Sequence, residues 1–190
     1  RRQRQMCIRD RYTAVDVQDE RQLAFYEHNG FKMDYTEDLV RLNDPDEVPQ
    51  LFNCSCITLP LNTVQEQMDL VSRMRGAGFS YFDHGFLLQQ MNRQNFAALG
   101  ILYGSNLVGA CVAAGQYTSA EVMGLYIVPE FQRKGLGTRL LQQTKQALAS
   151  TGVTDLTMRV MSDSEPQVRL VQRFRAELVE HTSVFPSMQI

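Results

Sequence analysis

The sequence predicts an α/β protein in which helices flank a mixed sheet. From Leu51 onward, segments of strand-like composition alternate with segments whose apolar residues recur at helical spacing. The glycine-containing stretch PEFQRKGLGT at 129–138 separates a predicted strand from a predicted helix. A strand–helix–strand order occurs at 12–42 and again at 153–190, which predicts two related units.

The first elements of the longer unit are a strand and two helices. The stretch NCSCITLPL at 53–61 is typical of a strand. A helix is expected over 63–74, where Thr63 and Glu66 fit a capping box. Its apolar face is made by Val64, Met68, Val71 and Met74. A second, short helix is expected over 86–92.

Three strands and a helix should follow. The segments 95–104 and 106–117 predict two strands joined by a turn, and 120–128 predicts a third strand that Pro129 stops. The helix after the glycine-containing turn can end at Gly152. One face of that helix is apolar and contains Leu136, Leu140, Leu141 and Leu148.

The two ends of the chain share one order of elements. A strand is expected over 155–160, a helix with proline in its first turn over 165–174, and an extended stretch over 177–190. The segment 12–42 likewise predicts strand, helix and strand. A polar linker over 43–50 should join it to the longer unit.

The first eleven residues, RRQRQMCIRDR, resemble the translation of an adapter used to prepare DNA libraries for sequencing. We therefore treat 1–11 as non-native and expect the gene to be truncated upstream of Tyr12. The 190 residues carry a formal net charge of −2, which becomes −6 without this segment, since it holds five arginines and one aspartate. An acidic chain disfavours a nucleic acid or an acidic membrane as partner. No apolar run approaches the roughly 18 residues that predict a membrane span.

The cysteines and histidines predict no metal site. Cys54 and Cys56 form an isolated C-x-C, and Cys111 lies in an apolar strand. A structural zinc site needs four ligands at suitable spacing. The histidines, however, are scattered: His28, His84 and His181. We expect buried, reduced thiols in a cytoplasmic protein.

The turn at 129–138 is suited to binding an anion, because a helix start presents unpaired N–H groups and the positive end of the helix dipole. A Walker P-loop needs lysine after its last glycine, but here Lys134 precedes Gly135. A dinucleotide-binding fingerprint needs a third glycine where this chain has Leu140. Neither phosphate-binding motif fits.

A third pattern, Q/R-x-x-G-x-G/A between a strand and a helix, is satisfied by Gln132, Gly135 and Gly137. With its flanking elements, this stretch resembles the GNAT superfamily of N-acetyltransferases, and the resemblance covers 51–190. It implies the GNAT fold, with a central mixed, twisted sheet flanked by helices, and acetyl-CoA as co-substrate. The turn would bind the pyrophosphate of acetyl-CoA through successive backbone N–H groups. These belong to Arg133, Lys134, Gly135, Leu136, Gly137 and Thr138.

The upstream segment carries a resemblance of its own. LAFYEHNGF at 23–31 resembles the C-terminal helix signature of the same superfamily. Tyr26 falls where many members have the tyrosine that protonates the departing thiolate. The segment 12–42 is therefore interpreted as the C-terminal remnant of an upstream unit. It has no pyrophosphate turn, so we expect a chain beginning near Glu47 to fold and to bind acetyl-CoA.

The resemblance also implies catalytic roles in the longer unit. Glu121 lies eleven residues before Gln132, the spacing of the catalytic glutamate in histone-type members, and is the candidate base. Gly124 interrupts its strand and predicts a bulge, after which the Leu125 N–H would stabilise the oxyanion. Beside the pantetheine the resemblance places Ile127 and Val128.

The sequence departs from the family pattern at two positions. Val171 replaces the usual tyrosine, and Ser164 replaces an asparagine of the cofactor site. Two functions therefore fit. One is an N-acetyltransferase that acts on a primary amine of a small molecule or peptide, with water protonating the thiolate. The other is a catalytically weak acyl-CoA-binding module of a tandem regulatory protein. No motif identifies the acceptor, and oligomeric state is not predicted.

Overall fold

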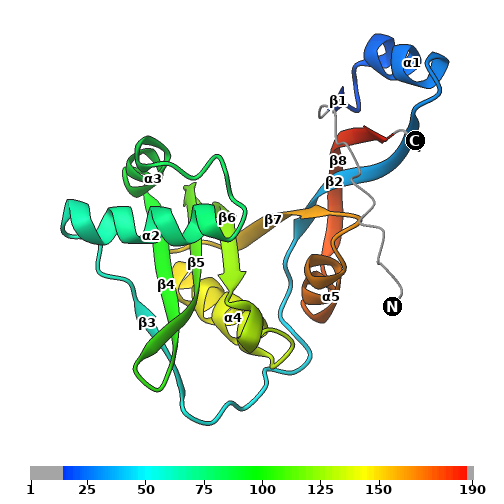
Figure 1. Cartoon of the computed structure of the whole chain (residues 1–190). Coiled ribbons are helices and arrows are strands. Elements are labelled where there is room, and N and C mark those ends of the chain that lie inside the picture. Colours follow the sequence, from blue (N-terminus) through cyan, green and yellow to red (C-terminus); the bar gives the residue numbers. More distant parts are fainter. Residues whose placement is uncertain (1–14, 188–190) are drawn as a thin grey trace, which may run out of the picture. The chain divides into compact units, whose positions relative to one another are not determined.

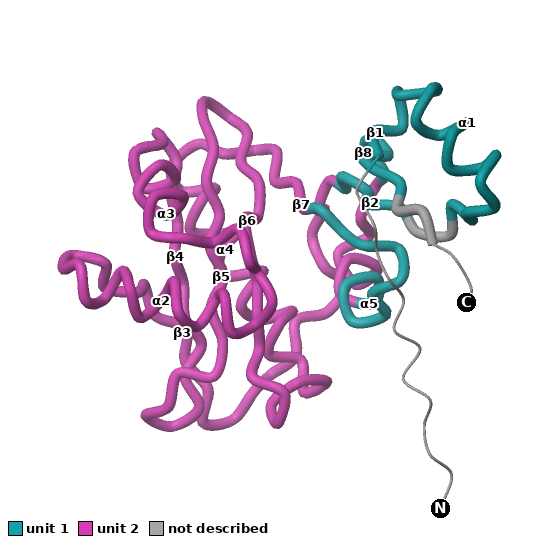
Figure 2. Tube along the Cα trace, turned by 45° about the horizontal axis from the view of Figure 1, so that its top comes forward, with its two compact units in different colours: residues 1–40, 159–169, 178–190 teal, residues 41–158, 170–177 magenta. Residues whose placement is uncertain are grey.

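The computed structural model describes residues 15–187, and Figure 1 shows their helices and strands. The chain forms two compact units, coloured separately in Figure 2. Unit 1 comprises 1–40, 159–169 and 178–190, and unit 2 comprises 41–158 and 170–177. Each unit therefore combines segments that are distant in the sequence.

Unit 2 contains most of the predicted α/β core. Its strands are β3 (Cys54–Thr58), β4 (Asn95–Tyr103), β5 (Asn106–Gln116), β6 (Ser119–Ile127) and the first half of β7 (Asp155–Met161). Its helices are α2 (Val64–Gly76), α3 (His84–Met91), the 3-10 turn η1 (Pro129–Phe131) and α4 (Leu136–Ala149). The strand order is β3-β4-β5-β6-β7. All neighbours are antiparallel except β6 and β7, which are parallel, so the predicted mixed sheet is confirmed.

Side-chain caps fix where α2 and α3 begin. The Thr63 hydroxyl accepts the Glu66 N–H at 3.2 Å, and the Glu66 carboxylate accepts the Thr63 N–H at 2.9 Å. The predicted capping box is therefore confirmed. Helix α3 begins two residues earlier than predicted, because the Asp83 carboxylate accepts the Phe86 N–H at 2.7 Å and caps it.

Helix α4 covers one face of this sheet, and α2 and α3 cover the other. A Cβ on Gly137 of α4 would lie 3.8–3.9 Å from Ile127 and Leu125 of β6. A Cβ on Gly124 of β6 would instead lie 3.4 Å from Met74 of α2. Because Gly124 and Leu125 are consecutive strand residues, they point to opposite faces. The core between the sheet and α2–α3 includes Leu70, Met74, Phe82, Leu87, Ala110, Val112 and Tyr126.

The cysteines follow their positions in the sheet. Among the described residues, Cys54, Cys56 and Cys111 are free thiols. Cys111 is buried in β5, and burial raises its pKa to about 12, so it stays protonated near neutral pH. Cys54 and Cys56 are only partly buried, contrary to expectation, because β3 lies at the end of the strand order. Within 15–187 no cluster of three metal-ligating side chains occurs.

Unit 1 combines both ends of the described chain. It contains β1 (Val15–Asp16), α1 (Glu20–His28), nearly all of β2 (Lys32–Arg41), the end of β7, the start of α5 (Glu165–Arg173) and β8 (Glu177–Ser187). The strand order there is β1-β8-β2-β7. Strand β2 is thus hydrogen-bonded between two strands that follow it by more than a hundred residues. Thr36 and Ser162 exchange two hydrogen bonds at this point, each of 2.9 Å.

The linker predicted at 43–50 has no helix or strand, but several contacts hold it to unit 2. The Asn43 N–H donates to the Phe174 carbonyl at 3.1 Å. Lys145 forms an ion pair with Asp44 at 2.8 Å and lowers the pKa of that carboxyl. Residues 1–14 and 188–190, with the adapter-like segment among them, lie outside the described range. Over 15–187, no helix combines the length and the apolar character that crossing a membrane requires.

Candidate functional site

The predicted anion-binding turn joins β6 to α4. The Gln132 side chain donates to the Ile127 carbonyl at 2.8 Å, and the Gln132 N–H donates to the Pro129 carbonyl at 3.2 Å. Both bonds close the loop that contains η1. Gln132 therefore shapes the turn through both its side chain and its backbone.

The two motif glycines have different structural roles. Gly135 has φ +83°, and a Cβ there would lie 2.7 Å from Pro49 Cγ. A side chain at this position would be strained by both its backbone conformation and this contact. Gly137 has ordinary helical geometry, and a Cβ added there would have Ile127 Cγ1 as its nearest neighbour, at 3.8 Å. Only Gly135 is required by the backbone.

Alanine substitutions at the two glycines should separate these roles. Gly135→Ala is expected to lower the free energy of unfolding by about 1–3 kcal/mol. Gly137→Ala should leave it unchanged or raise it by up to about 1 kcal/mol, because alanine favours helix. Urea unfolding of both variants measures the difference. Equal stabilities would contradict the role assigned to the Gly135 conformation.

Helix α4 begins without a side-chain cap. Its N-cap is Gly135, and its first turn holds no acidic residue. Helices α1, α2 and α3 are instead capped by Asp19, Thr63 and Asp83. The first helical bond of α4 runs from the Arg139 N–H to the Gly135 carbonyl at 3.1 Å. The N–H groups before it have no intrahelical acceptor and belong to Leu136, Gly137 and Thr138.

Two cations adjoin these amides. Arg133 and Lys134 are exposed and directly precede Gly135. Lys134 Nζ lies 5.1 Å from the centre of the Phe131 ring, a cation–π distance that restricts the lysine. Arg133 adopts φ +60°, so the chain turns sharply before the helix. Unpaired amides, the helix dipole and two cations together suit a multiply charged anion such as a pyrophosphate.

Strand β6 contains the bulge predicted at Gly124. Val112 of β5 pairs with Gly124, and the next residue, Ala113, pairs with Val122. Met123 is therefore the extra residue on β6. The parallel pairing with β7 also ends at Val122. In the described chain, no strand pairs with the outer edge of β6 beyond that point.

The hydrogen-bond pattern indicates which amides face this edge. The Val128 N–H donates to the Val108 carbonyl of β5 at 2.8 Å. Antiparallel pairing alternates between bonded and non-bonded residues, so Tyr126 also bonds toward β5, while Leu125 and Ile127 point their backbone groups outward. The Leu125 amide thus faces the open edge. The Val128 carbonyl accepts the Phe131 N–H at 2.9 Å, which leaves Val128 only its side chain for a cofactor contact.

The remaining candidates differ in their surroundings. Glu121 is partly exposed on β6 and, two residues before Met123, shares the face covered by α2 and α3. Val171 is 7 % exposed and packs as a core residue.

Ser164 lies in unit 1, where it precedes α5 and its carbonyl accepts the Val168 N–H at 2.9 Å. A cavity of about 470 Å³ is lined by Met161, Asp163, Ser164, Glu165, Pro166 and Gln167.

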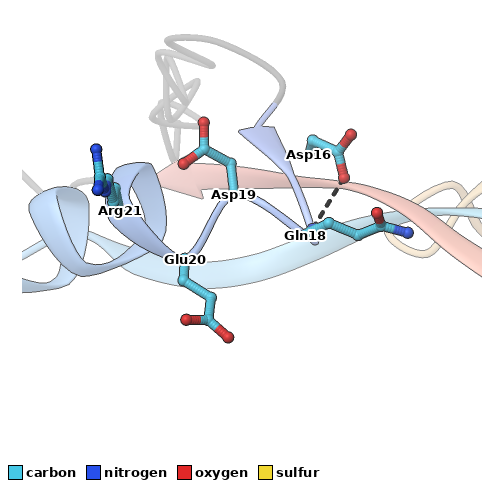
Figure 3. A pocket seen from close by; sticks show the side chains of 5 residues that line it. All are labelled: Asp16, Gln18, Asp19, Glu20 and Arg21. Atoms are coloured by element: carbon cyan, nitrogen blue, oxygen red, sulfur yellow. Dashed lines mark hydrogen bonds between the residues drawn. The ribbon is translucent and has the colours of Figure 1, made fainter.

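Tyr26 and a second cavity also belong to unit 1. The Tyr26 ring packs edge-to-face against Phe31 at 5.2 Å. The cavity, of about 500 Å³, is lined by Asp16, Gln18, Asp19, Glu20 and Arg21. Figure 3 shows that the Asp19 and Glu20 side chains point in different directions. Asp19 is occupied as the cap of α1, accepting the Gln22 N–H at 3.0 Å. This cavity therefore lacks convergent catalytic groups.

The sequence interpretation missed one residue beside the bulge. The Tyr81 hydroxyl donates to the Met123 carbonyl at 2.6 Å. Tyr81 lies between α2 and α3, 42 residues before Met123 in the chain. Sequence patterns over a few residues do not predict a contact between two residues so far apart in the chain.

Comparisons with known proteins identify the family and the fold of this chain. The model of the acetyltransferase (GNAT) family matches residues 65–175. No curated protein matches the chain in sequence. A GCN5-related N-acetyltransferase from Sphaerobacter thermophilus has a similar structure, with a TM-score of 0.68 and 14% identity over 92% of this chain and 58% of that chain.

Two further solved structures share the fold. A tandem GNAT protein from the clavulanic acid biosynthesis pathway has a TM-score of 0.64 and 19% identity, over 93% of this chain and 62% of its own. An aminoglycoside acetyltransferase from an uncultured soil metagenomic sample, in complex with sisomicin, has a TM-score of 0.53 and 17% identity, over 65% of this chain and 88% of its own. The chain thus covers only about six tenths of the length of the Sphaerobacter thermophilus protein and of the tandem GNAT protein. Because the family model covers more than half of the sequence, the chain belongs to the GNAT family of acetyltransferases.

Proposed function

We propose that this chain is an N-acetyltransferase that moves an acetyl group from acetyl-CoA to a primary amine of a small molecule or peptide. The family implies acetyl-CoA. The observation that carries the proposal is the uncapped start of α4 behind Gly135, which follows a strand, β6, whose outer edge pairs with no strand of the described residues beyond Val122. One solved relative, an aminoglycoside acetyltransferase, supports an amine acceptor of small size.

The residues of the turn and of β6 divide the binding work. The amides before Arg139, together with Arg133 and Lys134, would hold the pyrophosphate. Bound acetyl-CoA supplies an acetyl group activated as a thioester. The outward-facing Leu125 N–H would donate to the thioester carbonyl oxygen, where negative charge develops during attack by the amine.

Several protons must move during the transfer. Glu121 would accept the proton that the attacking ammonium loses, directly or through a water molecule. The neutral amine then attacks, and the C–N bond forms as the C–S bond breaks; the nitrogen gives up its second proton to water, and the thiolate takes a proton. Val171 cannot donate a proton, so water serves as the donor. A thiol has an ordinary pKa near 8.5, so its thiolate can leave without a side-chain acid.

A second function, a catalytically weak acyl-CoA-binding module of a tandem protein, is favoured by the buried Val171. A screen for release of the CoA thiol over aminoglycosides, other amines and peptides distinguishes the two. Release above the rate without acceptor supports the enzyme. Tight acetyl-CoA binding with no release for any acceptor supports the binding module.

Cofactor binding is tested at Gly137. Gly137→Glu is expected to weaken acetyl-CoA binding by more than about 2 kcal/mol, roughly 30-fold, because it adds bulk and negative charge beside the pyrophosphate. Gly137→Gln is the matched control for bulk alone and should lose less affinity. Calorimetry on folded variants measures both, and unchanged affinity of Gly137→Glu would refute this site.

A further inference from the structure

We propose that Tyr81 is a positioning residue of this site, whose hydroxyl holds the bulge carbonyl of Met123 and thereby orients the segment of β6 that carries Glu121 and Leu125. The catalytic part of this inference rests on the proposed acetyltransferase function. The structural part, that Tyr81 fixes the bulge, stands on the geometry of the free protein.

The contact is short and joins two elements of unit 2. Tyr81 Oη lies 2.6 Å from the Met123 carbonyl oxygen. Met123 is the residue that the β5–β6 pairing leaves over, so its backbone lacks a regular partner residue across β5. Tyr81 supplies an external bond where the ladder is interrupted. Its side chain remains half exposed, with 54 % of the residue accessible.

Neighbouring aromatic rings hold Tyr81 in place. Its ring meets Phe86 edge-to-face at 5.4 Å and Phe79 at 6.1 Å. Phe86 belongs to α3, and its N–H is fixed by the Asp83 cap. The Asp83 N–H in turn donates to the Tyr81 carbonyl at 3.0 Å. The Tyr81 ring is therefore already held by packing and by the capped start of α3. Its side chain loses little further conformational freedom when the hydroxyl bonds to the Met123 carbonyl.

Because the peptide bond is planar, fixing the Met123 carbonyl also fixes the backbone that follows it in β6. The Met123 carbonyl and the Gly124 N–H belong to one planar trans unit and point in opposite directions. Holding the carbonyl therefore sets the direction of the Gly124 N–H. Glycine, which follows immediately, has the widest backbone freedom of any residue. Without the Tyr81 bond, the backbone around Gly124 would vary more in conformation. The Leu125 amide on one side and the Glu121 segment on the other would then be less precisely oriented.

The test compares two tyrosine-to-phenylalanine variants. Tyr81→Phe removes the hydroxyl and keeps the ring. Tyr126→Phe is the matched control, because the Tyr126 hydroxyl is buried without a hydrogen-bond partner among the described residues. Burial raises the pKa of Tyr126, and the charge of nearby Arg73 acts in the opposite direction. Losing that hydroxyl should cost no stability.

Two readouts are needed. Amide hydrogen exchange on the free proteins reports the bulge, and steady-state kinetics with the best acceptor from the screen reports catalysis. Tyr81→Phe should speed exchange of the Gly124 amide, which the alternation along β6 directs toward β5, about tenfold, the ordinary contribution of one hydrogen bond. It should lower kcat by a similar factor and leave acetyl-CoA affinity within about twofold. Tyr126→Phe should change none of these quantities.

Each result decides between the two parts of the inference. Unchanged exchange in Tyr81→Phe would overturn the structural part. Faster exchange would overturn the positioning role if kcat stays unchanged. For this comparison, kcat is calculated from the concentration of acetyl-CoA sites that calorimetry measures. An equal loss in Tyr126→Phe would also overturn it, since any hydroxyl of this core would then matter. Failure of the proposed acetyltransferase function shows separately, as absence of turnover in the parent protein with every acceptor of the screen.

Discussion

A chain that begins at Glu47 is expected to lose its cooperative fold. The deletion removes β2, which the structure places between β8 and β7. Both neighbours would then expose unpaired N–H and C=O groups along an open edge. The deletion also removes Val40 and Leu42, which are 8 % and 3 % exposed. Thermal unfolding followed by circular dichroism should show a broad transition or aggregation in place of a single cooperative step.

A chain that begins at Tyr12 is the matched control for this deletion. It lacks the adapter-like segment and keeps β2, so its melting transition should equal that of the parent. This expectation differs from the one the sequence alone suggests, in which 12–42 is a dispensable remnant. A Glu47 chain that melts cooperatively and binds acetyl-CoA with parental affinity would show that 12–42 is dispensable after all.

Glu121→Gln is expected to reduce turnover roughly 100-fold near neutral pH while acetyl-CoA affinity stays unchanged. The amide keeps the size of the carboxylate but cannot accept the ammonium proton, so the loss should fall on kcat. Thiol-release kinetics with the best acceptor measure turnover, and calorimetry measures affinity. Glu121 lies on the strand face that α2 and α3 cover, whereas α4 and the turn before it lie on the other face.

Glu180→Gln is the matched control, because Glu180 is an exposed strand glutamate in unit 1 with no proposed role. It should retain parental kcat and affinity. If Glu121→Gln instead matches the parent across about pH 6–9, Glu121 is an ordinary strand glutamate. The base would then have to be sought elsewhere on the face that carries Tyr81.

The sequence by itself determined the features that depend on near neighbours. The α2 capping box needs only Thr63 and a glutamate three residues later, so its two hydrogen bonds could be predicted. The bulge at Gly124 was predicted because an isolated glycine weakens a strand locally. Asp83 also carried a readable capping signal, and recognising it would have placed the start of α3 correctly.

Tertiary structure decided the features whose partners are distant in the chain. The segment 32–41 looks the same in sequence whether its strand pairs within an upstream unit or, as found, between β8 and β7. The Tyr81–Met123 bond likewise depends on how α2 and α3 pack over β6. Strand composition and spacing encode that a backbone can pair, but they do not encode with which strand. That choice depends on the burial and hydrogen bonding of the whole sheet, which no local pattern contains.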